Sequence, residues 1–238
     1  MNEPPATPTA THRARAWMRS AWAVFEKDAR LELRSRFALN LTLAFAGGTT
    51  VLVWLALGRE GASPTVLAAM LWMVLLFGAS VGLGRAFVYE AEGGTLLFLR
   101  LHAPAGALYA GKLLFNLVLV ALLSASTTPA FLLVLGQGVA NPGLLASSLA
   151  LGAVGLAGAA TLLASMLARA DQRGAALLPV LLFPLLAPVL LPGVRLTRGA
   201  LSGAFMWSTA QGDLTTLALF AATVITASAL LFEYVWTD

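Results

Sequence analysis

The sequence predicts an all-α integral membrane protein, in which an N-terminal amphipathic interfacial helix precedes six transmembrane helices. The first observation is composition, because 59% of the 238 residues are hydrophobic and only 11% are charged, against roughly a quarter charged in soluble proteins. The second is six apolar runs, most of which reach the roughly 20 residues that a helix needs to cross the hydrocarbon. The runs cover residues 38–57, 66–84, 108–135, 144–168, 176–192 and 214–235.

The chain before the first run divides into two parts. Residues 1–16 are rich in proline and threonine and contain no apolar run, which predicts a disordered tail. From 17 to 37 apolar residues recur every three or four positions among charged ones, which predicts an amphipathic helix in the headgroup layer. Its interfacial residues would be Trp22, Phe25, Arg30 and Arg34, with the arginines toward anionic lipid. A helix that binds a soluble partner is the alternative.

Residues 38–238 form the predicted six-span domain, and its fifth run differs from the others. Prolines recur there every four or five residues, so this span should be kinked or broken into a partly re-entrant segment. We expect the following stretch, 193–213, to be a loop that returns to the interface. Glycines at Gly78, Gly82 and Gly152 favour close packing of helices within the chain, with a dimer interface as the alternative.

Basic residues set the predicted orientation. With the N-terminus inside, twelve lysines and arginines fall in inner segments, and only Arg59, Arg195 and Arg198 fall in outer loops. The excess of basic residues on the cytoplasmic side predicts that both termini and the segment 85–112 are cytoplasmic. This distribution also argues against nucleic-acid binding.

Several kinds of chemistry are excluded by missing residues. The chain has no cysteine, and the six runs carry no ionisable residue away from their ends, so ion relays and intramembrane catalytic dyads lack their groups. We therefore predict no catalytic, cofactor-binding or metal-binding residue. The stretch from Gly106 to Lys112 fits the start of a phosphate-binding loop, but Leu113 stands where a magnesium-binding hydroxyl is needed. Lys112 is expected to anchor the third span at the interface.

The segment between the second and third spans is the predicted docking surface. Glu90 and Glu92 precede two glycines and the short apolar run 96–99, a pattern that predicts a short amphipathic helix on the cytoplasmic side. Such a coupling helix would contact a soluble partner. Alternatively, the two glutamates only stabilise the start of the helix.

Two stretches carry a family resemblance. Phe25 to Asn40 and Glu90 to Asn116 resemble the two signatures of the haem exporter protein B family, permease subunits of the ABC transporter of cytochrome c biogenesis in the bacterial inner membrane. The resemblance implies a homodimeric, non-enzymatic subunit that binds no cofactor itself, with haem as possible substrate and ATP bound by a separate ATPase subunit. It also implies a haem-handling membrane subunit and a small single-span subunit as partners. The ATPase-coupling residues would be Glu90, Glu92, Gly94, Thr95, Leu96, Leu99 and Arg100.

Two alternatives share this architecture. An ABC-2-type exporter permease would move a lipid, a polysaccharide or a drug. A membrane scaffold would transport nothing and would only couple ATPase movement to release of haem from a partner.

Overall fold

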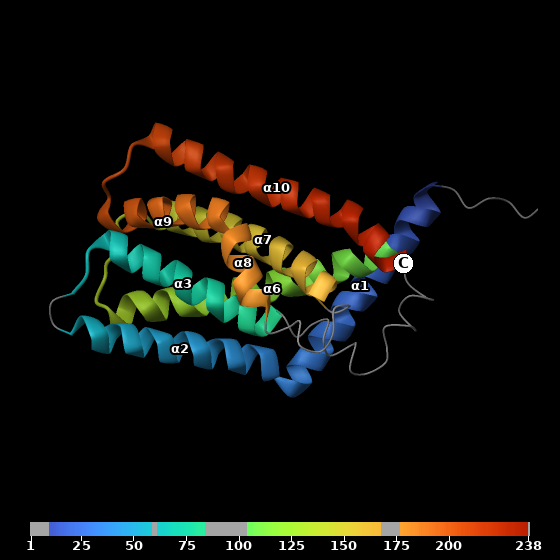
Figure 1. Cartoon of the computed structure of the whole chain (residues 1–238), viewed down its shortest axis with the longest axis horizontal. Helices are drawn as coiled ribbons and strands as arrows, with labels where there is room; N and C mark the ends of the chain where they lie inside the picture. Colours follow the sequence, from blue (N-terminus) through green and yellow to red (C-terminus); the bar gives the residue numbers. More distant parts are fainter. Residues whose placement is uncertain (1–9, 59–60, 84–103, 168–176, 238) are drawn as a thin grey trace, which may run out of the picture.

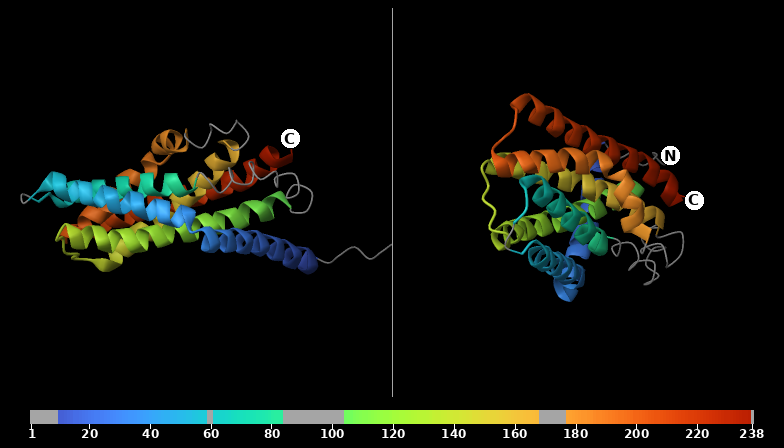
Figure 2. Two further views of the ribbon diagram at one scale, coloured as in Figure 1. Left: turned by 90° about the horizontal axis from the view of Figure 1, so that it is seen from below. Right: turned by 60° about the vertical axis from the view of Figure 1, so that its left-hand side comes forward.

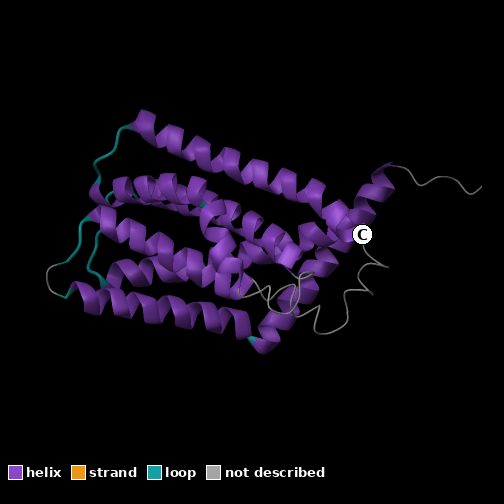
Figure 3. Ribbon diagram, viewed as in Figure 1, coloured by secondary structure: helices purple, strands orange, loops and turns teal. Residues whose placement is uncertain are grey.

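The structure, a computed structural model, describes residues 10–58, 61–83, 104–167 and 177–237. These residues form helices and short connections, and no strand occurs among them (Figure 3). The helices are α1 (Ala10–Ser35), α2 (Phe37–Leu57), α3 (Pro64–Leu83), α6 (Ala105–Val134), α7 (Pro142–Leu167), α8 (Leu178–Leu185), α9 (Ala187–Ser202) and α10 (Trp207–Thr237). Helix α1 begins at Ala10, so residues 10–16 belong to the helix and not to the predicted tail.

The long helices lie side by side as a bundle, and α1 crosses one end of it obliquely (Figure 1). Helices α2 and α10 lie at opposite edges of the bundle in Figure 1 and in the right-hand view of Figure 2. Both expose many apolar side chains, including Leu52, Leu55, Leu219 and Leu230. Because such side chains are stable only away from water, these edges suit contact with lipid or with other subunits.

Five helices are long and apolar enough to cross a membrane: α2, α3, α6, α7 and α10 from Trp207 to Phe232. Helices α8 and α9 together form a sixth candidate, which is bent by 68°. The all-helical fold with five to six spans is therefore confirmed. The predicted break in the fifth span is also present, because Pro188 has no N–H for the helical bond to residue 184 and its ring crowds that carbonyl.

The predicted loop 193–213 is wrong. Helix α9 continues to Ser202, and only residues 203–206 separate it from α10. The predicted run ends at residue 192, before Arg195 and Arg198, and an isolated charge is costly in a membrane. In the structure Arg195 pairs with Asp213 of α10, so the two charges compensate each other and both helices extend past them.

The bundle core is organised around Trp72 of α3. Its indole lies on Gly152 of α7 and Gly193 of α9, where an added Cβ would overlap the ring. The indole N–H donates a hydrogen bond to Thr197 Oγ1 at 2.9 Å. On α3 itself, a Cβ at Gly82 would lie 2.5 Å from the Thr42 methyl group of α2. These glycines therefore serve packing within the chain, which is the first of the two roles predicted for them.

Candidate coupling site

Helix α1 is docked along the start of α6. Its buried face carries Val24, which is 5% exposed, and Asp28, which is 8% exposed. The backbone contact is close, because a Cβ at Gly111 of α6 would lie 2.5 Å from the carbonyl oxygen of Ala21 and 2.7 Å from the Cβ of Val24. Only glycine allows the two helices to approach this far without a shift.

A buried ion pair joins the same two helices. Lys112 Nζ lies 2.9 Å from Asp28 Oδ2, and the lysine side chain is only 1% exposed. Lys27 Nζ lies 3.2 Å from the other carboxylate oxygen of Asp28. The predicted role of Lys112, anchoring a span in the interface, is therefore wrong. Its ammonium group is buried because a carboxylate on α1 compensates the charge.

We refer to the contact of Val24 with Gly111 and the pair Asp28 with Lys112 as the α1–α6 clamp. One turn after Lys112, the Asn116 side chain donates a hydrogen bond to Thr161 Oγ1 of α7 at 2.8 Å. Helix α6 is thus fixed to α1 at its start and to α7 directly afterwards. A displacement of the start of α6 must therefore be shared with both neighbours.

A sharp bend at Arg36 connects α1 to α2. Arg36 has φ 51° and ψ 21°, in the left-handed region that non-glycine residues seldom occupy. The carboxylate of Glu32 spans the bend and accepts a hydrogen bond from the Leu39 N–H at 2.7 Å. The start of a helix has N–H groups without helical partners, so Glu32 stabilises α2 from the end of α1.

Three of the four predicted interfacial residues, Trp22, Arg30 and Arg34, are exposed, whereas Phe25 packs against the core. Trp22 is 58% exposed, and its ring centroid lies 5.1 Å from that of the half-buried Phe25. Arg30 is exposed and pairs with Glu26 at 2.5 Å, and Arg34 is exposed one turn later. Their contact with lipid remains a prediction. The sequence pattern did not reveal the additional face of α1 that packs on α6.

The predicted coupling residues lie outside the described residues. Glu90, Glu92, Gly94, Thr95, Leu96, Leu99 and Arg100 fall between the end of α3 at Leu83 and the start of α6 at Ala105. The flanking helix ends lie at the end of the bundle that α1 crosses (Figure 1). The segment is thus connected directly to the clamped part of α6.

The motif that resembles a phosphate-binding loop is helical. Residues from Gly106 to Lys112 form the first turns of α6, so their N–H groups do not surround an anion as those of such a loop do. Within the part of the chain that the structure describes, no group of three or more His, Cys, Asp or Glu residues is arranged to hold a metal ion.

Comparison with known proteins identifies the family. The CcmB protein family matches residues 19–233, which is nearly the whole chain. The chain belongs to the CcmB family. Heme exporter protein B of Paracoccus denitrificans is 32% identical over 189 residues, covering 76% of this chain and 84% of the relative. Heme exporter protein B of Rhodobacter capsulatus is 30% identical over 183 residues, with the same coverage.

The match to the CcmB family begins within α1 and ends within α10, and it includes the segment 84–103. The family resemblance read from Phe25 to Asn40 and from Glu90 to Asn116 is therefore confirmed. The α1–α6 clamp lies inside the matched region of this CcmB family member. It joins the two stretches, because Asp28 belongs to the first, Gly111 and Lys112 belong to the second, and Val24 directly precedes the first.

Proposed function

We propose that this chain is the non-catalytic permease subunit of an ABC transporter that acts in cytochrome c maturation, with haem as its substrate. The observation that carries this proposal is the CcmB family match over residues 19–233. The relatives that the chain matches over 84% of their length are named Heme exporter protein B. The bundle of membrane-spanning helices supplies the membrane half of such a transporter, and a separate ATPase subunit binds and hydrolyses ATP.

In this proposal the ATPase docks on the segment between α3 and α6. Glu90 and Glu92 contact a basic surface of the ATPase, and the apolar run with Leu96 and Leu99 holds the segment against its neighbours. The segment leads directly into α6, whose first turns are clamped to α1. Movement of the docked ATPase therefore displaces α6 and α1 together, and the bend at Arg36 transmits this displacement to α2.

The surroundings of the chain follow from the same proposal. The chain lies in the bacterial inner membrane with both termini in the cytoplasm, and the arginines of α1 face anionic headgroups. It forms a homodimer, because the exposed apolar edges at α2 and α10 leave surface for a second copy as well as for lipid. A haem-handling membrane subunit and a small single-span subunit complete the complex.

The test is recovery of the ATPase with a tagged chain, normalised to the amount of chain in the membrane. Glu90→Lys with Glu92→Lys replaces attraction by like-charge repulsion, which costs several kcal/mol when the groups are partly desolvated. We expect loss of the ATPase and of c-type cytochromes with normal membrane insertion. The control is Gln137→Lys with Gln211→Lys, two positions near the opposite end of the bundle. If the Glu90/Glu92 variant recovers as much ATPase as the parent chain, the segment is not the docking site.

The same preparation tests the substrate. Haem or a porphyrin bound to the purified complex supports haem as the substrate. A bound lipid or polysaccharide in its place, with normal cytochrome c maturation in cells that lack the chain, would instead favour a general exporter permease.

A further inference from the structure

A second candidate site lies at the end of the bundle opposite the α1–α6 clamp. A pocket of about 410 Å³ opens there between the start of α7, the end of α9 and the start of α10. Its apolar wall is formed by Leu144, Leu196, Ala204, Phe205, Met206 and Ala210. Its polar groups are Arg195, Arg198, Thr209 and Asp213. Small-molecule sites have this size and this mixture of an apolar wall with few polar groups.

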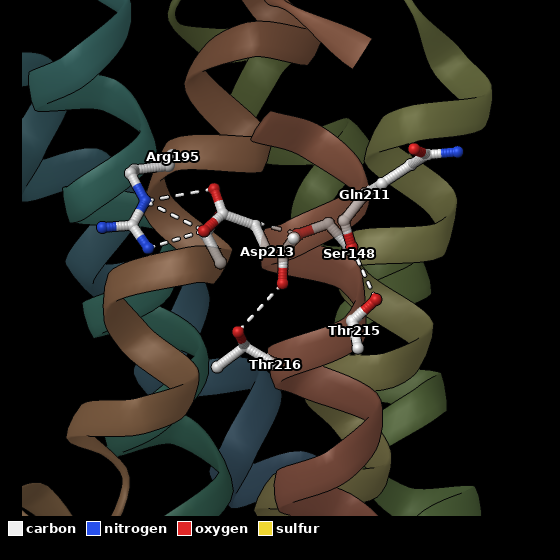
Figure 4. Close-up of polar contacts among 8 residues, drawn as sticks. Ser148, Arg195, Gln211, Asp213, Thr215 and Thr216 are labelled. Atoms are coloured by element: carbon white, nitrogen blue, oxygen red, sulfur yellow. Dashed lines mark hydrogen bonds and ion pairs between the residues drawn. The ribbon is translucent and has the colours of Figure 1, made fainter. Parts of the chain in front are cut away.

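The charges in this pocket do not cancel. Arg195 Nε lies 3.1 and 3.0 Å from the two carboxylate oxygens of Asp213, and a terminal nitrogen of its guanidinium lies 2.6 Å from one of them. Figure 4 shows this guanidinium facing the carboxylate across the gap between α9 and α10. The pair is therefore bidentate, and the negative charge of Asp213 is compensated by Arg195.

Other polar groups near Asp213 are already bonded within their own helix. The hydroxyls of Thr215 and Thr216 donate hydrogen bonds to the carbonyl oxygens of Gln211 and Gly212 (Figure 4). The Arg198 side chain remains exposed, and no carboxylate or hydrogen-bond partner faces its guanidinium among the described residues, while its backbone carbonyl accepts a hydrogen bond from the Ser202 hydroxyl. The pocket thus offers one uncompensated guanidinium beside an apolar wall.

We propose that this pocket binds an amphipathic anion, a molecule with a carboxylate or phosphate group on an apolar body. Arg198 binds the acidic group, because a guanidinium matches the geometry of carboxylate and phosphate oxygens. Phe205, Met206 and Leu196 contact the apolar body. The Arg195–Asp213 pair holds α9 and α10 in place and so fixes the spacing between the arginine and the apolar wall. A phospholipid headgroup region and a porphyrin with its carboxylates both have this chemistry.

The pocket also has a built-in reporter. Trp207 is 59% exposed and follows directly on Phe205 and Met206 of the lining. A fluorescent acid bound in the pocket would therefore accept excitation energy from this indole. Binding by the purified chain needs no ATPase. A negative binding result would therefore contradict this inference without contradicting the proposed haem export.

The experiment titrates dansyl-labelled undecanoic acid into the purified full chain in phosphatidylcholine nanodiscs and records dansyl emission on tryptophan excitation. We expect a saturable signal that falls in Trp207→Phe, with the remainder coming from Trp72, whose indole bonds to Thr197 beside Leu196 and Arg198 of the lining. Arg198→Gln should weaken binding about tenfold, as expected for loss of a charge-assisted hydrogen bond at an open site. Arg198→Lys should restore most of the affinity. The matched control is Arg36→Gln, an exposed arginine between α1 and α2 at the other end of the bundle, which should bind like the parent.

Competition identifies the natural source of the anion. Displacement by lysophosphatidylglycerol assigns the pocket to lipid, and displacement by mesoporphyrin but not by its dimethyl ester assigns it to a porphyrin. Displacement by neither would contradict the proposal. Equal binding of the dansyl acid and its neutral amide, or unchanged affinity in Arg198→Gln, would also overturn it.

Discussion

The most informative perturbation of the α1–α6 clamp is Lys112→Met. It leaves Asp28, which is 8% exposed, with Lys27 at 3.2 Å as the ion-pair partner that remains among the described residues. Removing one partner of a buried ion pair costs about 3–5 kcal/mol. Because Lys27 is 36% exposed and still compensates part of the charge, we expect the lower end, about 3 kcal/mol. This free energy opposes the docking of α1 on α6.

The assay is the rate at which a maleimide labels Val24→Cys, the position that packs against Gly111. The chain has no native cysteine, so the introduced thiol is the only reactive one. Val24 is 5% exposed, so its thiol reacts only when α1 detaches from α6. A loss of about 3 kcal/mol raises the detached population, and with it the labelling rate, about 100-fold.

Two further variants make the result decisive. Ala23→Cys lies on the exposed face of α1 and should label rapidly with or without Lys112. Asp28→Leu with Lys112→Met replaces both charges by apolar side chains, which is often neutral in a buried site, so Val24→Cys should be protected again. An unchanged labelling rate in Lys112→Met would refute the reasoning that the ion pair holds the helix.

Three other predictions follow from the structure. Gly152→Ala should destabilise the chain by about 1–3 kcal/mol in a detergent unfolding titration, because its Cβ would overlap the core indole ring, whereas Gly47→Ala has open space and should be close to neutral. Glu32→Ala should lower stability by about 1 kcal/mol through loss of its hydrogen bond at the start of α2, and Glu32→Gln, which retains an acceptor oxygen, should recover most of it. In intact cells, cysteine at Ser63 should label with an impermeant reagent and cysteine at Gln172 only after permeabilisation, and the reverse pattern would contradict the cytoplasmic placement of the termini.

The main features of the fold could be predicted from hydropathy alone. The starts and ends of α2, α3 and α7 lie within two residues of the apolar runs, because a helix in lipid must satisfy its own backbone and its side chains must be apolar. The break in the fifth span was predictable from its prolines, because the missing N–H at Pro188 disrupts a helix in any surroundings.

Features that depend on pairs of distant residues could not be predicted in this way. Hydropathy assigns a cost to every charge separately, so it gives no reason to bury Lys112 near the start of the third run or to extend the fifth run past Arg195. Asp28 and Asp213 compensate these charges from other helices. The signal in the sequence was present but weak. Asp28 occupies the same helical face as Val24, and Lys112 lies inside an apolar run, so each charge interrupts an apolar face.

The family was predictable where the fold details were not. The stretches from Phe25 to Asn40 and from Glu90 to Asn116 resemble the family in residue order, and that order does not depend on knowing which side chains meet. The role assigned to Glu90 and Glu92 rests on the same resemblance. It stays a prediction, because these residues lie outside the part of the chain that the structure describes.

The central claim is that ATPase movement reaches the membrane helices through α6 and requires α1 to be clamped to it. One measurement tests it directly: c-type cytochrome content and co-purified ATPase, determined in the same cells for the parent chain, Lys112→Met, and Asp28→Leu with Lys112→Met. We predict that Lys112→Met retains the ATPase but loses cytochrome c maturation, and that the double variant recovers it. Normal maturation in Lys112→Met, under conditions where Val24→Cys labelling shows α1 to be detached, would contradict the claim.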